Sequence, residues 1–579
     1  MRTIDPVTLA VLKGRLEQVA DEMDATLYRS AFNPIIAEAR DACHGLYHAR
    51  TGATLVQGTK GLPIFVGAMA FAVKAVIDKV AAEGGLQEGD IFLFNDPYDG
   101  GTHLNDFRLV QPVFRGGELF CWLASVGHWL DIGGNVPGNF NARATESFQE
   151  GVRIPPVKVV RAGVLDNDIV SILAANSRVP QSNWGDMNGQ LNALALGSRR
   201  LGALLDEYGE DTVEAAFTAF SAGAEAMMRE NIGALPDGTW SFEDYLDNDG
   251  IDDAPLTIAL DLTIAGSEMT LDFSRSSPPC KGPLNIAYST AVACCYVALK
   301  HVFTEVPANA GCLAPIRFVI PETTLLGVKA PKPVGGYTET ILRVIGVLFG
   351  ALGKVAPERA MAAPFGTINA LSLAGARPQG GRFVMFSFFG GGLGGNPESD
   401  GLNHANNPIS TATIPPVEIL EASYPVMFTQ WALRPDSAGP GRHRGGVGAI
   451  YEIETLAEGT TDVFLLGERG KYAPFGVLGG GEAGLNSFAW QTQDGEASPP
   501  LVSKVTDVRI GRGQRVTLRT PGGGGYGSPL ERPAVRVARD VALGFVSIAA
   551  ARDSYGVVIA TDGSVDEAAT ARLRQEKTA

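Results

Sequence analysis

The feature that most limits the fold of this chain is how often glycine and proline interrupt it. The 579 residues include 71 glycines and 35 prolines. Glycine adopts backbone conformations that other residues avoid, and proline breaks helices and central strands. Such a chain is divided into short elements joined by many turns. We therefore expect many short strands, with helices only where apolar residues recur at helical spacing.

Helical spacing is concentrated in the N-terminal half of the sequence. Residues 5–30, 66–82 and most of 165–232 place apolar side chains at a period near that of an α-helix. Beyond Leu235, the alternation in "APLTIALDLTIAGSEMTLDF" predicts strands, and "STAVACCYVALKHVF" and "ILRVIGVLFGALGKV" predict two apolar helices. From about residue 380 onward the pattern is of strands and glycine-rich turns, and roughly the last 40 residues predict a strand, a helix and a polar tail.

These patterns predict a mixed α+β, multi-domain chain with a helix-rich N-terminal half and a mainly β C-terminal third. At 579 residues the chain exceeds an ordinary single domain. We expect three regions: an α/β region with a candidate metal site at 1–235, an α+β region at 236–380, and a mainly β region at 381–579.

Charge and cysteine content narrow the class of protein. The net charge is −16 and no block of Lys or Arg stands out, which argues against a nucleic-acid surface. The N-terminus lacks the apolar segment of a signal peptide, and no apolar run has the length of a membrane span. The six cysteines form no C-x-x-C pair, which is typical of reduced thiols in a cytoplasmic protein.

Two His-x-x-Asp segments give the clearest sign of chemistry. "NDPYDGGTHLNDF" contains His103 and Asp106, and "GHWLDIGG" contains His128 and Asp131. Each follows a strand-like run, "DIFLFN" or "LFCWLASVG", so rigid strands would position both. Imidazole and carboxylate ligands together suit Mn, Fe or Zn. The pattern predicts a metal site, and hydrogen-bonded core histidines are the alternative interpretation.

The other motifs are weaker. "PGGGGYG" and "FFGGGLGGNP" resemble phosphate-binding loops, but neither matches G-x-x-x-x-G-K-[ST], and tight turns between strands are expected instead. No G-x-S-x-G elbow supports a hydrolase triad. Cys294 and Cys295 lie in an apolar run typical of inert core thiols. His404, in the polar loop "DGLNHANNP", is a candidate for lining a substrate site.

Further segments carry a resemblance to a known family. They are "DPVTLAVLKGRLEQVADEM", "NDPYDGGTHLNDFRLVQPVF", "GHWLDIGG", "FQEGVRIPPVKV", "GPLNIAYS", "VPANAGCLAPI", "PPVEILEASYPV", "LRPDSAGPGRHRGG" and "TPGGGGYG". In this order, from about residue 5 to residue 530, they resemble the hydantoinase B/oxoprolinase family. The resemblance implies a B-type subunit that works with an A-type subunit carrying the ATP site.

The resemblance also implies roles for particular residues. His103, Asp106 and His128 match the positions that hold a divalent transition metal (Zn, Mn or Fe) in carboxylase relatives. Asp41, in "EARDAC", is our choice for a fourth ligand. Asp131 is expected to orient a ligand or to act as general base. Asp96 is the other candidate base, unless it only fixes the turn before Pro97.

The implied function is ATP-dependent opening of a cyclic amide such as a hydantoin, 5-oxoproline or a lactam. A subunit of a ketone carboxylase and a non-catalytic scaffold are the alternatives. In "GGYTETILR" the chain departs from relatives at Tyr337 and Ile341, and its "DGLNHANNPIS" loop is compressed. Tyr337 and His404 are therefore expected to line the substrate pocket. The expected assembly is an (AB)2 complex.

Overall fold

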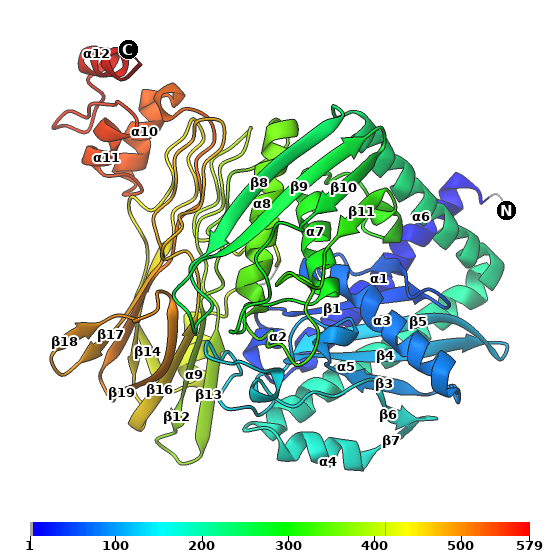
Figure 1. Cartoon of the computed structure of the whole chain (residues 1–579). Coiled ribbons are helices and arrows are strands. Elements are labelled where there is room, and N and C mark those ends of the chain that lie inside the picture. Colours follow the sequence, from blue (N-terminus) through cyan, green and yellow to red (C-terminus); the bar gives the residue numbers. More distant parts are fainter. Residues whose placement is uncertain (1–3, 411–412, 579) are drawn as a thin grey trace.

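The computed structural model describes residues 4–410 and 413–578, and this part of the chain forms twelve α-helices and four β-sheets (Figure 1). The α-helices are α1 (Pro6–Ser30), α2 (Pro34–Ala37), α3 (Pro63–Glu83), α4 (Asn167–Ala175), α5 (Pro180–Tyr208), α6 (Glu210–Gly233), α7 (Tyr288–Val302), α8 (Tyr337–Val355), α9 (Val417–Ser423), α10 (Ala534–Ala542), α11 (Ile548–Asp553) and α12 (Glu567–Thr578). Among these described helices, none has the length and apolar character needed to cross a bilayer.

The first sheet has the order β2-β1-β5-β4-β3-β6-β7, and every neighbouring pair in it is antiparallel. Its strands are β1 (Ala42–His48), β2 (Thr54–Gln57), β3 (Ile91–Phe94), β4 (Asp106–Arg115), β5 (Glu118–His128), β6 (Val157–Arg161) and β7 (Val164–Leu165). The second sheet, in the order β11-β10-β9-β8, consists of β8 (Gly238–Leu246), β9 (Leu256–Ala265), β10 (Glu268–Asp272) and β11 (Ile316–Val319).

Two further sheets form the C-terminal third. One has the order β13-β12-β16-β19 and the other the order β14-β15-β20-β17-β18. Their strands are β12 (Ala370–Ala376), β13 (Arg382–Ser387), β14 (Val426–Leu433), β15 (Ala449–Thr455), β16 (Glu458–Leu466), β17 (Ser487–Thr492), β18 (Gly495–Ala497), β19 (Lys504–Gly511) and β20 (Arg515–Arg519). The predicted α+β class is confirmed.

Short-range sequence signals explain the boundaries of the long helices. The carboxylate of Asp5 accepts hydrogen bonds from the first free amides of α1, and Pro6 occupies the first helical position. α3 ends at Gly84, whose φ of 70° is strained for residues with a side chain. The apolar run 341–355 forms most of α8, a helix that is almost wholly buried. The predicted helices at 5–30, 66–82 and 341–355 are present.

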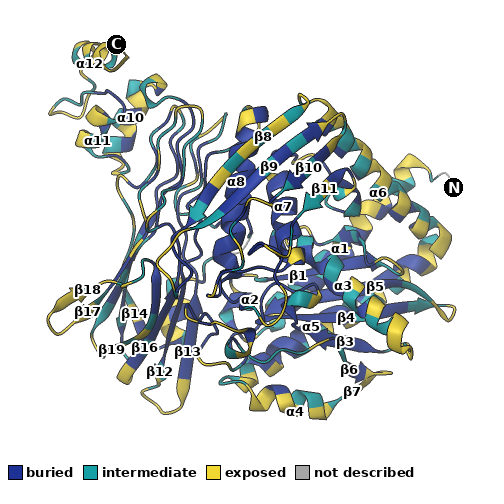
Figure 2. Cartoon of the chain, in the orientation of Figure 1, coloured by how far each residue is buried: buried dark blue, intermediate teal, exposed yellow. Residues whose placement is uncertain are grey.

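The first sheet separates two hydrophobic cores. Leu109 and Leu123 belong to the core beneath α1 and α5, whereas their neighbours Val110 and Ala124 belong to the core that contains α3, α7 and α8. Successive side chains of a strand point to opposite faces, so both faces of this sheet are covered. Figure 2 shows these strands dark blue, whereas the outer face of α6 is exposed. The polar residues at the strand ends are therefore held in a dry, rigid setting.

The larger core crosses the predicted region boundaries. It includes residues from Ile35 to Leu466, with α7 and α8 at its centre. The first two sheets lie within 42–165 and 238–319, and β12 begins the third sheet at Ala370, before the predicted boundary at 381. The first and middle regions are thus packed around one core.

The glycine-rich runs are not the tight turns expected from the sequence. Four glycine-rich segments run alongside one another, near residues 390–395, 439–448, 476–481 and 521–527. In Figure 1 they are seen among the extended yellow and orange loops, which are drawn without arrows because they are not β-strands. The Gly523 amide donates to Gly446 at 3.0 Å, and a Cβ on Gly523 would lie 2.0 Å from the carbonyl oxygen of Leu393. Glycine is needed here because backbone packs directly on backbone.

The C-terminal tail also differs from the prediction. In place of a strand, a helix and a polar tail, it forms α10, α11 and α12 around a small core of its own. Ion pairs connect this unit to the rest of the chain, from Asp540 to Arg444 at 3.1 Å and from Arg532 to Asp400 at 2.6 Å. Short apolar stretches do not distinguish strands from helices, which explains the error.

Candidate metal centre

The 25-residue interval between His103 and His128 is the length of a β-hairpin. β4 begins at Asp106 and β5 ends at His128, and these two residues are directly opposite each other in the antiparallel register. His103 lies in the loop just before β4, after Gly100, whose φ is 87°. A Cβ on Gly100 would lie 2.4 Å from the backbone of α3, so glycine lets the loop approach that helix closely.

The hairpin places three potential ligand atoms in a small triangle. His103 Nε2 lies 3.1 Å from Asp106 Oδ1, His128 Nδ1 lies 3.2 Å from the same oxygen, and the two nitrogens are 3.2 Å apart. All three side chains are buried. Metal–ligand bonds of 2.0–2.2 Å place neighbouring ligand atoms roughly 3.0–3.4 Å apart, so this triangle matches one face of a metal site.

The donor set also fits a divalent transition metal chemically. Two imidazoles and one carboxylate on one face of a site are typical of Fe, Mn and Zn centres. Burial raises the pKa of the Asp106 carboxyl, but the nearby rings of His103 and His128 outweigh it and hold that pKa well below its ordinary value. An ionised carboxylate between two imidazoles is suited to hold a cation.

Asp41 lies beside the triangle and lines the same cavity as His103 and His128. Its Oδ1 atom is buried and has no hydrogen-bond partner among the described residues, while its backbone carbonyl accepts from the His128 amide at 3.3 Å. Burial is the main cause that raises the pKa of Asp41 to about 7; His128 opposes this rise and Asp106 contributes to it. An unpartnered buried carboxylate oxygen needs a proton or a cation.

Hydrogen bonds hold the Asp106 carboxylate from its other side. The hydroxyl of Thr102 donates to Asp106 Oδ2, and Tyr337 donates to the same oxygen at 3.5 Å. Arg108 in turn donates to Thr102 at 2.7 Å and to the Asp106 carbonyl at 2.5 Å. These contacts leave Oδ1 directed at the two histidines. Hydrogen bonds to the far side of a ligand are what orient it toward a metal.

Tyr337 is brought to the site, as expected. Its ring stacks on His103 with centroids 4.6 Å apart, and burial raises its pKa well above the ordinary value, so the hydroxyl remains a donor. On the other side, Asn33 donates to the His128 carbonyl at 2.9 Å and to Asp186 at 2.9 Å. Both ends of the hairpin are therefore fixed by buried polar contacts.

Asp131 is not brought into the cluster. Its Oδ1 accepts from the amides of Gly133 and Arg178, and its Oδ2 accepts from Gly138 and, at 2.8 Å, from the Arg178 guanidinium. With both oxygens occupied, this carboxylate fixes the loop after β5. The structure gives Asp131 no contact with His128 through its side chain, so it offers no support for an orienting or basic role.

Asp96 and His404 also lie apart from the triangle. Asp96 accepts from the Tyr98 amide at 3.0 Å and pairs with Arg153 at 3.5 Å, and burial raises its pKa. It therefore fixes the turn before the loop. His404 packs between aromatic rings of the C-terminal sheet, where the Trp431 indole donates to it at 2.8 Å. Neither Asp96 nor His404 lines the cavity at the triangle.

The cavity itself is walled by residues that the sequence did not single out. It measures about 40 Å³. Its lining besides Asp41, His103, His128 and Tyr337 is Leu62, Ile64, Phe140, Thr338, Ile368, Phe386, Phe388, Asn406, Ile409 and Ser410. Asn406 is only two residues beyond His404, so the same loop contributes to the wall of this cavity through a different residue. Phe386 and Phe388 belong to an apolar run whose pattern is that of ordinary core, and Phe140 lies in the polar loop after β5.

A buried Asp-His-Ser arrangement lies deeper in the first sheet. His44 Nδ1 is 2.6 Å from Asp24 Oδ1, and His44 Nε2 is 2.9 Å from the Ser125 hydroxyl. All three side chains are at most 1% exposed, and Gln190 also donates to Ser125 at 3.3 Å. A nucleophile must reach its substrate, so this network joins α1, β1 and β5 and is not a hydrolase triad.

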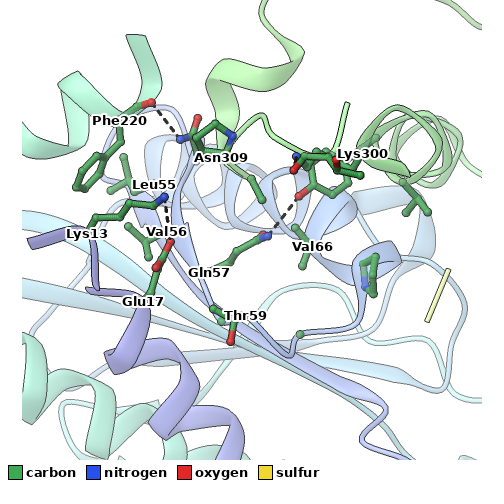
Figure 3. Close-up of a pocket in the computed structure, with 18 of the residues that line it drawn as sticks. Lys13, Glu17, Leu55, Val56, Gln57, Thr59, Val66, Phe220, Lys300 and Asn309 are labelled. Atoms are coloured by element: carbon green, nitrogen blue, oxygen red, sulfur yellow. Dashed lines mark hydrogen bonds and ion pairs between the residues drawn. The ribbon is translucent and has the colours of Figure 1, made fainter. Parts of the chain in front are cut away.

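A larger cavity of about 510 Å³ lies on the surface between α1, β2, α6 and α7 (Figure 3). Its charged groups are already engaged. Lys13 pairs with Glu17 at 4.0 Å, and the Lys300 ammonium donates to backbone carbonyls, among them Phe303 at 3.1 Å. Gln57 donates to the Tyr296 hydroxyl at 3.3 Å. This cavity has room for a small molecule, but its described side chains form no set of catalytic or metal-binding groups. The candidate functional site is therefore the His103, Asp106 and His128 triangle.

Comparison with known proteins places the chain in a family. The family model for hydantoinase B/oxoprolinase matches residues 5–529. The chain belongs to the hydantoinase B/oxoprolinase family. It is 34% identical to the beta chain of the caprolactamase of Pseudomonas jessenii, over 98% of this chain and 99% of that one. It is 31% identical to the B-type subunit of a putative D-/L-hydantoinase of Pseudomonas sp. (strain NS671), over 99% of both chains.

Solved structures show the same architecture for this family member. The crystal structure of the ATP-dependent caprolactamase from Pseudomonas jessenii matches with a TM-score of 0.90 and 32% identity, over 99% of this chain and 100% of that one. A nucleotide-free acetone carboxylase structure matches with a TM-score of 0.91 and 22% identity, over 99% of this chain and 83% of that one. The latter likeness concerns the fold alone.

Proposed function

We propose that this chain is the B-type subunit of an ATP-dependent hydrolase that opens a cyclic amide. The observation that carries the proposal is the triangle of His103, Asp106 and His128, held by a hairpin at the mouth of a small cavity. Its membership of the hydantoinase B/oxoprolinase family and its full-length similarity to a chain of a caprolactamase support the type of substrate.

The chemistry explains why two subunits are needed. Resonance stabilises an unstrained amide against attack by water. Phosphorylation of the carbonyl oxygen by ATP on an A-type partner makes the ring carbon electrophilic. Addition of one water to that carbon, followed by cleavage of the ring C–N bond with protonation of nitrogen, gives an open-chain acyl phosphate. A second water then hydrolyses the acyl phosphate to the open-chain acid and inorganic phosphate. The sequence contains no Walker A motif, which agrees with an ATP site on the partner.

Each residue of the site has a defined task in this proposal. His103, Asp106 and His128 would hold the divalent metal, and Asp41 would supply the fourth ligand. When bound, the metal supplies a Lewis acid that lowers the pKa of water toward neutrality. Thr102 and Tyr337 keep the Asp106 carboxylate turned toward the two imidazoles. The surrounding apolar wall excludes bulk water, which protects a reactive phosphorylated substrate.

The test uses the chain co-expressed with its A-type subunit. Metal content of the tag-free complex is measured for the native protein, for His103→Ala, and for His404→Ala as a matched control, because His404 lies outside the cavity. We expect about one transition-metal ion per chain and ATP-coupled lactam hydrolysis in the native and control proteins, and neither in His103→Ala. Turnover by His103→Ala, or a metal-free active complex, would refute the proposal.

A ketone carboxylase subunit is the second candidate, because the fold matches that of an acetone carboxylase. Both reactions use a metal and a carbonyl activated at the expense of ATP. Isotope-labelled bicarbonate separates them: label in the product supports carboxylation and counts against hydrolysis. The complete donor set of His103, Asp106 and His128 argues against a scaffold without chemistry, since such a chain has no use for it.

A further inference from the structure

The cavity beside the metal site has no cationic side chain in its lining. Among the described residues, its walls are aliphatic, aromatic or neutral and polar, apart from Asp41 and the two histidines. Any acidic group on a bound molecule would therefore lack a basic side chain to pair with.

Two buried arginines, Arg108 and Arg343, lie outside the lining of the cavity. Arg108 lies behind the triangle, where it donates to Thr102 and to the Asp106 carbonyl. Arg343, on α8, faces Asp244 at 3.5 Å and Glu468 at 3.7 Å, and it does not line the cavity. Neither guanidinium lines the cavity that the bound molecule would occupy.

Flat aromatic faces form one wall of the cavity. Phe140 and Phe386 stack with centroids 4.6 Å apart and planes at 9°, and Phe386 also stacks on His128 at 5.4 Å. Phe388, 6% exposed, continues this wall. Such surfaces favour a hydrocarbon or amide ring and give nothing to an anionic substituent.

We propose that the substrate of this chain is a small cyclic amide without a carboxylate or other anionic substituent. The proposal rests on the proposed function and narrows its substrate class. Inside this apolar wall, next to the carboxylates of Asp41 and Asp106, an anionic substituent would be desolvated without a partner. The cavity of about 40 Å³ holds roughly three water molecules, so a small ring already requires part of the wall to yield.

The test is a matched pair of probes, 2-pyrrolidinone and 5-oxoproline, which differ only in the carboxylate. Their dissociation constants are measured by calorimetry at pH 8 on the full-length chain, first stripped of metal and then with Mn²⁺. Without metal, a carboxylate gains no affinity from the ion itself. We expect 2-pyrrolidinone to bind at least about 100-fold more tightly, as burial of an unpaired charge implies.

Two variants at one position separate charge from size. The ratio of the dissociation constants of 5-oxoproline and 2-pyrrolidinone is expected to fall at least tenfold in Phe388→Lys, because the lysine supplies a cation. In Phe388→Met this ratio is expected to stay unchanged. If Phe388→Lys does not fold, the native ratio decides alone. Equal affinities, or no binding of either probe, overturn the substrate class. If 2-pyrrolidinone binds more tightly as expected but the complex with the A-type subunit shows no ATP-coupled turnover, the result counts against the proposed reaction and not against the substrate class.

Discussion

Replacing Asp106 by Asn is the most direct test of the metal centre. The Oδ1 atom of Asp106 is shared by His103 at 3.1 Å and His128 at 3.2 Å, so one carboxylate oxygen completes the triangle. An amide carries no charge, and its nitrogen would face the hydroxyl donors of Thr102 and Tyr337. Loss of a residue that only hydrogen-bonds to a ligand weakens metal binding about 10- to 100-fold. We therefore expect at least about 100-fold here, or about 2.7 kcal/mol.

The assay is competition for Zn²⁺ and Mn²⁺ between the purified chain and a fluorescent chelator. Asp131→Asn is the matched control, because the same substitution is made in the second His-x-x-Asp segment, where the carboxylate is held by Arg178 instead of the triangle. The control is expected to keep native metal affinity. The reasoning fails if Asp106→Asn binds metal as tightly as the native chain, or if Asp131→Asn loses as much affinity.

Three further predictions concern stability. Burial raises the pKa of the Glu150 carboxyl to about 7, against opposing hydrogen bonds from two backbone amides, so the folded state binds the carboxyl proton more tightly than the unfolded state does. The free energy of unfolding contributed by Glu150 therefore falls by about 3 kcal/mol as the pH rises from about 4 to 7. The urea midpoint of Glu150→Gln should lack this decrease with pH. Gly523→Ala should prevent folding or cost more than about 4 kcal/mol, whereas Gly14→Ala, with open space around it, should not destabilise, as circular dichroism and urea melts would show. A chain ending at residue 520 should be insoluble, because it lacks the 521–527 segment inside the glycine-rich layer. A chain ending at residue 528 should remain folded with native metal content. The soluble yield and the metal content of the two truncated chains check this prediction.

Local patterns predicted much of the fold. The bounds of α1, which starts at Pro6, and of α8, which ends at Val355, follow from apolar spacing, caps and glycine stops, which are short-range signals. The lateral packing of the glycine-rich segments could not be predicted, because it depends on contacts such as Gly523 with Gly446, 77 positions away in the numbering. A run of glycines states only that side chains are absent, and both a turn and close backbone packing satisfy that requirement.

The site was predictable to the extent that it depends on one hairpin. His103, Asp106 and His128 are local to β4 and β5, so strand pattern and spacing brought them together. Asp41 entered through its likeness to the family, and the structure places it in the cavity. Phe386 and Phe388 come from a sheet of the C-terminal third, and nothing in their own segment shows that they will face a strand end formed more than 250 residues earlier.

The two His-x-x-Asp segments show why spacing alone does not assign a role. In the first, Asp106 starts a strand and faces His128 across the hairpin, with no cation on its Oδ1. In the second, Asp131 follows the strand and meets Arg178, which arrives from the start of α5. The same three-residue interval therefore yields a member of the His103, Asp106 and His128 triangle where a strand begins, and a structural ion pair where one has ended.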